Sequence, residues 1–165
     1  MKWILFFLLI PFGSSSQTVH VKDEKIYYEG LIKINSSETN PEKALEEAEK
    51  NCSTRIHNLS INKNDSENKI TVLSEMNLTP TQSNINTLQY TLQLSVKQDH
   101  IKYKIDSFFL ITKERGGKAD TIPSKEIVKD MDVTGPVATA TEKKLNQIDM
   151  KIQELIDRLR NYFSQ

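Results

Sequence analysis

Residues whose types and spacing could support catalysis or metal binding are few in this sequence. The three histidines, His20, His57 and His100, share no spacing typical of metal ligands, and the single cysteine, Cys52, cannot form a zinc-binding pair. The glycine pair at 116–117 falls in a predicted connector rather than between a strand and a helix, where phosphate-binding loops lie. No glycine-flanked nucleophile of the hydrolase type is present. We therefore expect no enzymatic activity, no metal site and no cofactor.

The charge balance argues against nucleic acid as a partner. Lysine plus arginine and aspartate plus glutamate both number 22 among 165 residues, so the net charge at pH 7 is zero. Proteins that bind nucleic acid or an anionic membrane surface usually carry a basic excess. We expect neither partner, and the length predicts one domain with its own hydrophobic core.

The first sixteen residues have the pattern of a secretory signal peptide. Lys2 precedes an apolar run over 3–10, and Pro11 is followed by three serines at 14–16. The run is too short to span a bilayer, and no later stretch is apolar enough, so no membrane insertion is expected. The sequence predicts a signal peptide over residues 1–16 and a mature protein exported to the periplasm or the extracellular space.

Cys52 has two interpretations in an exported protein. An unpaired cysteine can form an intermolecular disulfide in an oxidising compartment. Cys52 also falls on the apolar side of a predicted helix, together with Ala44, Leu45 and Ala48, where a thiol packs as a small hydrophobic group. We favour a buried, unreactive thiol.

The elements that would position a site centre on a ribbon between Leu88 and Ile111. From Leu88 to Lys97 apolar residues alternate with polar ones, which is the period of a half-buried strand. After a turn at 98–99 the alternation resumes, with isoleucine and tyrosine on one side and lysine on the other. The run from Phe108 to Ile111 is apolar throughout, so the strand either bulges there or is covered on both faces.

Shorter patterns flank this ribbon. A strand is predicted over residues 25–34, in which Gly30 indicates a bulge or a close backbone contact. A helix follows, with Thr39 or Asn40 as its cap, and then two strands that end near Leu78. Residues 113–138 contain Gly-Gly and Gly-Pro pairs and read as a connector with at most one helical turn.

The last predicted element is an amphipathic helix over residues 139–165. Thr139 and Glu142 form a capping box, and apolar residues then recur with alternating three- and four-residue steps. These residues are Leu145, Ile148, Ile152, Leu155, Leu159 and Tyr162. We expect the helix to pack on the same domain, and a homodimer built on this stripe is the alternative.

Together the elements predict an α+β protein with an antiparallel sheet. The expected order is β-α-β-β-β-β-α, with the helices packed on one face of the sheet. In this scheme residues 17–112 form the sheet domain, residues 113–138 the connector and residues 139–165 the terminal helix.

Three segments carry a family resemblance: Ile26 to Gly30, the helix around Ala44 to Cys52, and Val96 to Asp106. They resemble a family of exported bacterial proteins of undescribed function with a TATA-box-binding-protein-like (TBP-like) fold. The resemblance implies that fold and an envelope or extracellular setting, and it supplies no catalytic residues. It does not imply DNA binding, because a fold can serve many functions.

The sheet surface turned away from the helices is the predicted binding site. Its expected residues are Tyr27, Leu31, Lys33, Gln89, Thr91, Gln93, Ser95, Lys102 and Lys104. Neutral hydrogen-bonding side chains dominate its central strand, and a tyrosine and a leucine would otherwise be exposed. We predict a non-enzymatic binding protein that contacts an envelope protein or a glycan through this face. The alternatives are a small-ligand carrier or inhibitor with a pocket between the sheet and the C-terminal helix, and a structural dimer.

Overall fold

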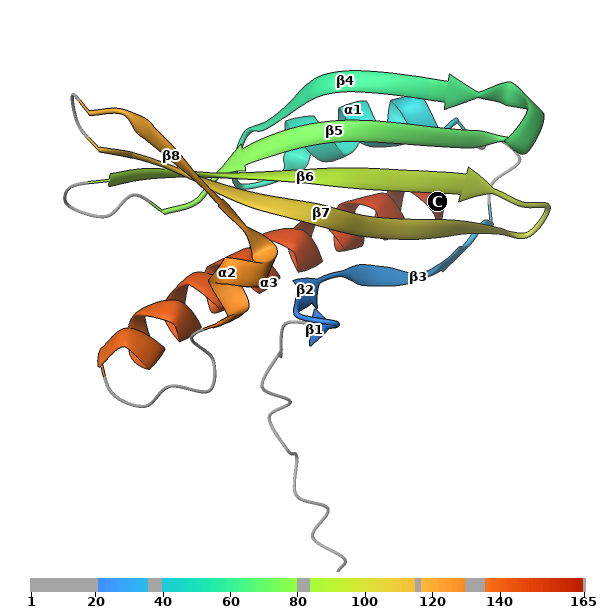
Figure 1. Cartoon of the computed structure of the whole chain (residues 1–165). Coiled ribbons are helices and arrows are strands. Elements are labelled where there is room, and N and C mark those ends of the chain that lie inside the picture. The colour runs from blue at the N-terminus through green and yellow to red at the C-terminus, as the bar shows by residue number, and fades with distance from the viewer. Residues whose placement is uncertain (1–20, 36–39, 80–83, 115–116, 130–135, 165) are drawn as a thin grey trace, which may run out of the picture.

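A computed structural model describes residues 21–35, 40–79, 84–114, 117–129 and 136–164. An antiparallel sheet is covered on one face by helices α1 (Pro41–Asn51) and α3 (Pro136–Phe163), as Figure 1 shows. This arrangement confirms the predicted α+β class. The predicted signal peptide over residues 1–16 lies outside the described residues.

The main sheet has six strands. They are β3 (Tyr28–Lys33), β4 (Ile56–Asn64), β5 (Lys69–Asn77), β6 (Asn84–Val96), β7 (His100–Glu114) and β8 (Ala119–Pro123). Their spatial order is β3-β7-β6-β5-β4, with β8 paired to the far part of β7, and every pairing is antiparallel. Consecutive strands from β4 to β8 are therefore neighbours joined by short connections, as expected for a meander.

Strand β6 lies in the middle of the sheet and supplies much of the core. Its inward residues Leu88, Tyr90, Leu92 and Leu94 are at most 1% exposed. Full burial of a side chain of this size contributes about 1.5–3 kcal/mol relative to exposure. The alternation in the sequence thus corresponds to one buried face and one face turned away from the helices.

Helix α1 begins where the sequence provides a cap. The Asn40 side chain accepts hydrogen bonds from the backbone N–H groups of Glu42 (3.0 Å) and Lys43 (3.2 Å), and Pro41 occupies the first turn. These bonds satisfy N–H groups that have no partner within the helix. Ala44, Leu45 and Ala48 are buried, so this narrow apolar stripe lies in the core.

Helix α3 packs on the domain in cis. Leu145, Ile148, Ile152, Leu155, Ile156, Leu159 and Phe163 are all at most 5% exposed within the single chain. These residues of the heptad stripe are therefore part of the protein's own core. The same buried side chains lie between α3 and the sheet. The helix begins at Pro136, earlier than the predicted cap at Thr139.

A carboxylate is buried in this interface. Asp149 of α3 is 1% exposed, and its Oδ1 accepts a hydrogen bond of 3.1 Å from the hydroxyl of Tyr28 in β3. The other carboxylate oxygen, Oδ2, is buried without a hydrogen-bond partner. Burial, followed by the repulsion of Asp149, raises the pKa of Tyr28 well above its usual range, so the phenol remains a donor.

Strand β7 contains the bulge that its sequence allowed. Gln89 pairs with Phe109 and Thr91 with Asp106, so β7 has one residue more than β6 between these pairs. Ser107 lies in this stretch with a φ of 55°, a left-handed conformation. Beyond the bulge Phe108 and Leu110 are the buried residues of the strand, at 1% exposure each.

The prediction of a plain connector over residues 113–138 is incomplete. Strand β7 continues to Glu114, strand β8 pairs with it from Ala119 to Pro123, and α2 occupies Ser124–Lys129. The helical turn expected near Ser124 is thus present. Ahead of the sheet, β1 (Val21–Lys22) and β2 (Lys25–Ile26) form a separate two-stranded hairpin. Of the helices within the described residues, none is long and apolar enough to cross a membrane.

Gly30 makes the close contact that its position in a strand indicated. It pairs with Tyr103 of β7, and the tyrosine ring lies across it. A methyl group placed at Gly30 would meet the Tyr103 hydroxyl oxygen at 2.6 Å and Cζ at 2.8 Å. Tyr103 is 8% exposed, so glycine allows the ring to pack against the β3 backbone.

Candidate functional site

The sheet surface opposite α1 and α3 is the candidate site, and we call it the open face. Its centre consists of the β6 side chains that alternate with the buried ones: Thr87, Gln89, Thr91, Gln93 and Ser95, all half-buried. None of the five carries a charge, and each has an amide or a hydroxyl group. Two strands on either side complete the surface (Figure 1).

Strand register decides which side chains lie beside this central row. Ser95 pairs with Lys69 of β5 on one side and with Lys102 of β7 on the other. Gln93 similarly lies between Thr71 and Lys104. Directly opposed residues of antiparallel strands have Cβ atoms about 4.5–5.5 Å apart. A lysine–serine–lysine row therefore crosses the sheet near the β6–β7 turn.

The structure brings eight of the nine predicted site residues onto the open face: Leu31, Lys33, Gln89, Thr91, Gln93, Ser95, Lys102 and Lys104. Leu31 is 63% exposed and pairs with Lys102, so an apolar side chain stands at the rim of the basic row. The ninth residue, Tyr27, lies between β2 and β3, outside the strand pairing, and is half-buried.

The opposite end of the open face is apolar, and sequence reasoning missed it. The Ser107 bulge turns Phe109 (37% exposed) and half-buried Ile111 outward, next to Gln89 and Thr87. Ile85 of β6, 46% exposed, continues the same row of outward positions. The uninterrupted apolar run at 108–111 was the signal, but only the position of the bulge decides which residues face outward.

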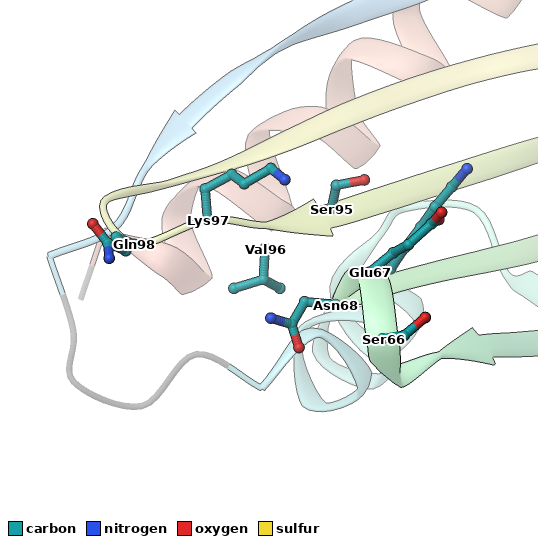
Figure 2. A pocket seen from close by; sticks show the side chains of 8 residues that line it. Ser66, Glu67, Asn68, Ser95, Val96, Lys97 and Gln98 are labelled. Atoms are coloured by element: carbon teal, nitrogen blue, oxygen red, sulfur yellow. The ribbon is translucent and has the colours of Figure 1, made fainter.

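A shallow hollow lies next to the basic end of the open face, where strands β5 and β6 meet their connections. It has a volume of about 820 Å³ and lies between the β4–β5 and β6–β7 connections. Its lining residues are Ser66, Glu67, Asn68, Lys69, Ser95, Val96, Lys97 and Gln98. Figure 2 shows the side chains of Ser95 and Lys97 on one side of strand β6 and that of Val96 on the other.

A backbone clamp holds the two connections together. Asn68 ends the short 3₁₀ turn Asp65–Glu67 with a left-handed φ of 49°. Its carbonyl oxygen accepts a hydrogen bond of 2.9 Å from the N–H of Val96, at the end of β6. The walls of the hollow are therefore fixed by the backbone, and its side chains project from defined positions.

Some charged side chains on this face have an oppositely charged partner and others have none within 4.0 Å among the described residues. Lys104 Nζ lies 2.6 Å from Asp106 Oδ2, and this hydrogen bond raises the pKa of the lysine. Nδ1 of His100 lies 2.7 Å from Asp99 Oδ1, and the hydrogen bond lowers the pKa of Asp99. In contrast, Lys69, Lys97 and Lys102 have no carboxylate within 4.0 Å among the described residues. These three ammonium groups are available to a ligand.

Comparison with solved structures identifies the fold. A TBP-like protein from Parabacteroides distasonis superposes with a TM-score of 0.55 and 11% identity, over 87% of this chain and 97% of that one. A DUF4468 family protein from Bacteroides ovatus gives a TM-score of 0.50 and 14% identity, over 90% and 87% of the two chains. The chain has a TBP-like fold. No protein-family model and no curated protein matches the sequence.

At these identities the similarity concerns the TBP-like fold alone. It confirms the fold that the strand pattern and the three quoted segments predicted. The ligand has to be argued from the side chains on this chain's own TBP-like sheet.

On the helical side of the TBP-like domain, Ser53, Lys151 and Glu154 form a hydrogen-bonded cluster that connects two helices. Glu154 of α3 accepts hydrogen bonds from Ser53 N–H (2.5 Å) and Ser53 Oγ (2.6 Å), and Lys151 Nζ donates to Ser53 Oγ (2.8 Å). Burial opposes ionisation of Glu154, but the Ser53 bonds and the nearby cations outweigh it and lower its pKa. The charged cluster joins the end of α1 to α3.

Cys52 adjoins this cluster and is half-buried. Burial, together with the charge of Glu154, raises the pKa of its thiol to about 11. The sulfur is therefore protonated at neutral pH, which makes it a poor nucleophile and supports the unreactive interpretation. Within the described residues, no three His, Cys, Asp or Glu side chains are grouped so that they could hold a metal ion.

Proposed function

We propose that this protein is an exported, non-enzymatic binding module that contacts an envelope protein or a glycan through the open face. The signal-peptide pattern at residues 1–16 supports export. The neutral amide and hydroxyl groups along β6 support binding, because they offer hydrogen bonds without the desolvation cost of charges.

The observation that carries the proposal is the bulge in β7. If Ser107 took a regular place in the alternation of β7 and did not form a bulge, Phe109 and Ile111 would face the core. With the bulge, Phe108 and Leu110 fill the core and two further apolar side chains lie on the surface that the helices leave uncovered. Exposed apolar side chains grouped on one face, within a polar surround, are typical of a contact surface.

Co-purification from a native envelope extract tests the proposal. The bait is residues 17–165, and the variant Thr91→Arg/Gln93→Arg places two charged side chains at the centre of the open face. Asn146→Arg/Asn161→Arg, at exposed positions of α3, is the matched control. We expect a partner that is retained by the native chain and the control and is lost with the open-face variant. A partner retained equally by all three chains contradicts the proposal.

A further inference from the structure

We propose that the basic end of the open face binds the carboxylate groups of an acidic polysaccharide. This inference rests on the proposed function and specifies its ligand. The site consists of Lys69, Lys97 and Lys102, together with Ser95 between them and the hollow at the β6–β7 turn. The central row of β6 then holds the rest of the chain.

The three lysines form a cationic group beside the hollow. Lys69 and Lys102 are the cross-strand neighbours of Ser95, and Lys97 follows two residues later on the same side of the chain. Among the described residues no carboxylate lies within 4.0 Å of their ammonium groups. Glu67 contributes a carboxylate to the lining, so the hollow combines a net positive charge with a hydrogen-bond acceptor. A charged carbohydrate with free hydroxyl groups matches this combination.

The size of the hollow suits a sugar unit. Ligand pockets commonly have volumes of about 300–1,000 Å³, and the hollow measures about 820 Å³. Asn68, Gln98 and Ser66 add amide and hydroxyl groups to its lining. These groups donate and accept hydrogen bonds, as the hydroxyls of a sugar require.

The shape of the open face favours a linear polymer over a small molecule. The outward row from Thr87 to Ser95 spans eight residue steps, or about 27 Å at a rise of about 3.4 Å per residue. Its five amide and hydroxyl side chains continue away from the lysines toward Phe109. The exposed Phe109 ring offers an apolar surface for the C–H face of a sugar at the far end.

A polysaccharide fits these features better than an acidic polypeptide. A polypeptide held through apolar anchor residues needs pockets at the centre of its contact surface. Here the central row of β6 is uniformly polar, the neighbouring Leu73 of β5 is half-buried beside Thr91, and the exposed apolar groups Leu31 and Phe109 lie toward the ends. Because the net charge of the protein is zero, the positive potential is confined to the surface around the three lysines. A long nucleic acid, which binds through many phosphates, is therefore disfavoured.

Binding to polygalacturonate, a carboxylated polysaccharide, tests the proposal with purified residues 17–165. Dextran serves as the neutral polysaccharide and poly-L-glutamate as the carboxylate polymer without sugar. The site variant is Lys69→Gln/Lys97→Gln/Lys102→Gln. The control Lys129→Gln/Lys143→Gln/Lys144→Gln removes the same charge from exposed positions of α2 and α3.

We expect polygalacturonate to bind more tightly than either other polymer, and the site variant to weaken that binding at least tenfold. The control variant should bind as the native chain does. Equal weakening by both variants would show that only overall charge matters and would overturn the inference. Absence of polygalacturonate binding, or tighter binding of poly-L-glutamate, would overturn it as well.

The two proposals can fail separately. If co-purification yields a protein partner that depends on Thr91 and Gln93 while polygalacturonate does not bind, the open face is a contact surface and the polysaccharide inference is wrong. If polygalacturonate binds through the three lysines while no envelope partner depends on Thr91 and Gln93, the basic end binds carboxylates by itself. In that case the part of the proposed function that rests on the central row is wrong.

Discussion

Replacement of Gly30 by alanine is the sharpest test of the packing between β3 and β7. The new Cβ would lie 2.6 Å from the Tyr103 hydroxyl oxygen, 2.8 Å from Cζ and 2.9 Å from Cε1. All three are shorter than van der Waals contact, so the ring has to move, and its 8% exposure leaves little free space. The backbone of Gly30 does not itself require glycine, since no left-handed φ is found there.

The magnitude of the effect follows from two opposing terms. Overpacking of a core typically costs about 1–3 kcal/mol. A glycine-to-alanine change at a compatible backbone position stabilises the folded protein by about 0.4–1 kcal/mol, because it reduces the conformational entropy of the unfolded chain. We therefore expect Gly30→Ala to lower the free energy of unfolding by about 1–2 kcal/mol, the difference between these terms.

Urea denaturation in two backgrounds isolates the cause. In a Tyr103→Leu chain the clash is absent, and Gly30→Ala should be neutral or stabilising by up to about 1 kcal/mol. The double-mutant cycle then gives a coupling free energy well above the roughly 0.5 kcal/mol scatter of independent sites. The reasoning is refuted if alanine costs the same in both backgrounds, or if it stabilises the native chain.

Three further outcomes are expected. Tyr28→Phe removes the donor to Asp149 and leaves its buried carboxylate unpartnered, so urea denaturation should show a loss of about 1–3 kcal/mol; an unchanged midpoint would contradict the interaction. The raised pKa values of Tyr28 and Cys52 mean that the unfolded chain releases these protons first. The contribution of these two groups to stability should be constant below about pH 8 and decrease as the pH rises through 9.0 and 10.0, the ordinary pKa values of a thiol and a phenol, and a midpoint independent of pH from 8 to 11 would refute this. The pKa of Glu154 is lowered, so its contribution is present above 4.5 and lost on acidification; Glu154→Gln should flatten the acid limb of the stability curve, and Ser53→Ala should do so in part.

Much of the fold could be predicted because its signals are local. The alternation from Leu88 to Val96 has a period of two, and the structure makes this segment a central strand with one buried face. Asn40 and Pro41 marked the start of α1, since capping depends on three neighbouring residues. Strand β8 has no such signal. It is short and largely exposed, and it is held by backbone pairing with β7, which a connector-like composition does not reveal.

Only part of the candidate site could be predicted from the sequence. The alternation of β6 has a period of two, so the residues of the central row could be named as outward-facing before the structure was known. Phe109 could not, because whether it faces the core depends on a single extra residue at Ser107, and an apolar run of four gives no indication of where the period shifts.

The hollow depends on a contact that no local pattern encodes. Asn68 and Val96 are separated by two strands, and their hydrogen bond of 2.9 Å exists only because the register of β5 on β6 pairs Lys69 with Ser95. A slip of one residue would turn Lys69 to the helical side and separate it from Lys102. The same register that buries the apolar side chains of β6 therefore assembles the lysine row. A core substitution that shifts the register should abolish ligand binding without altering any residue of the open face.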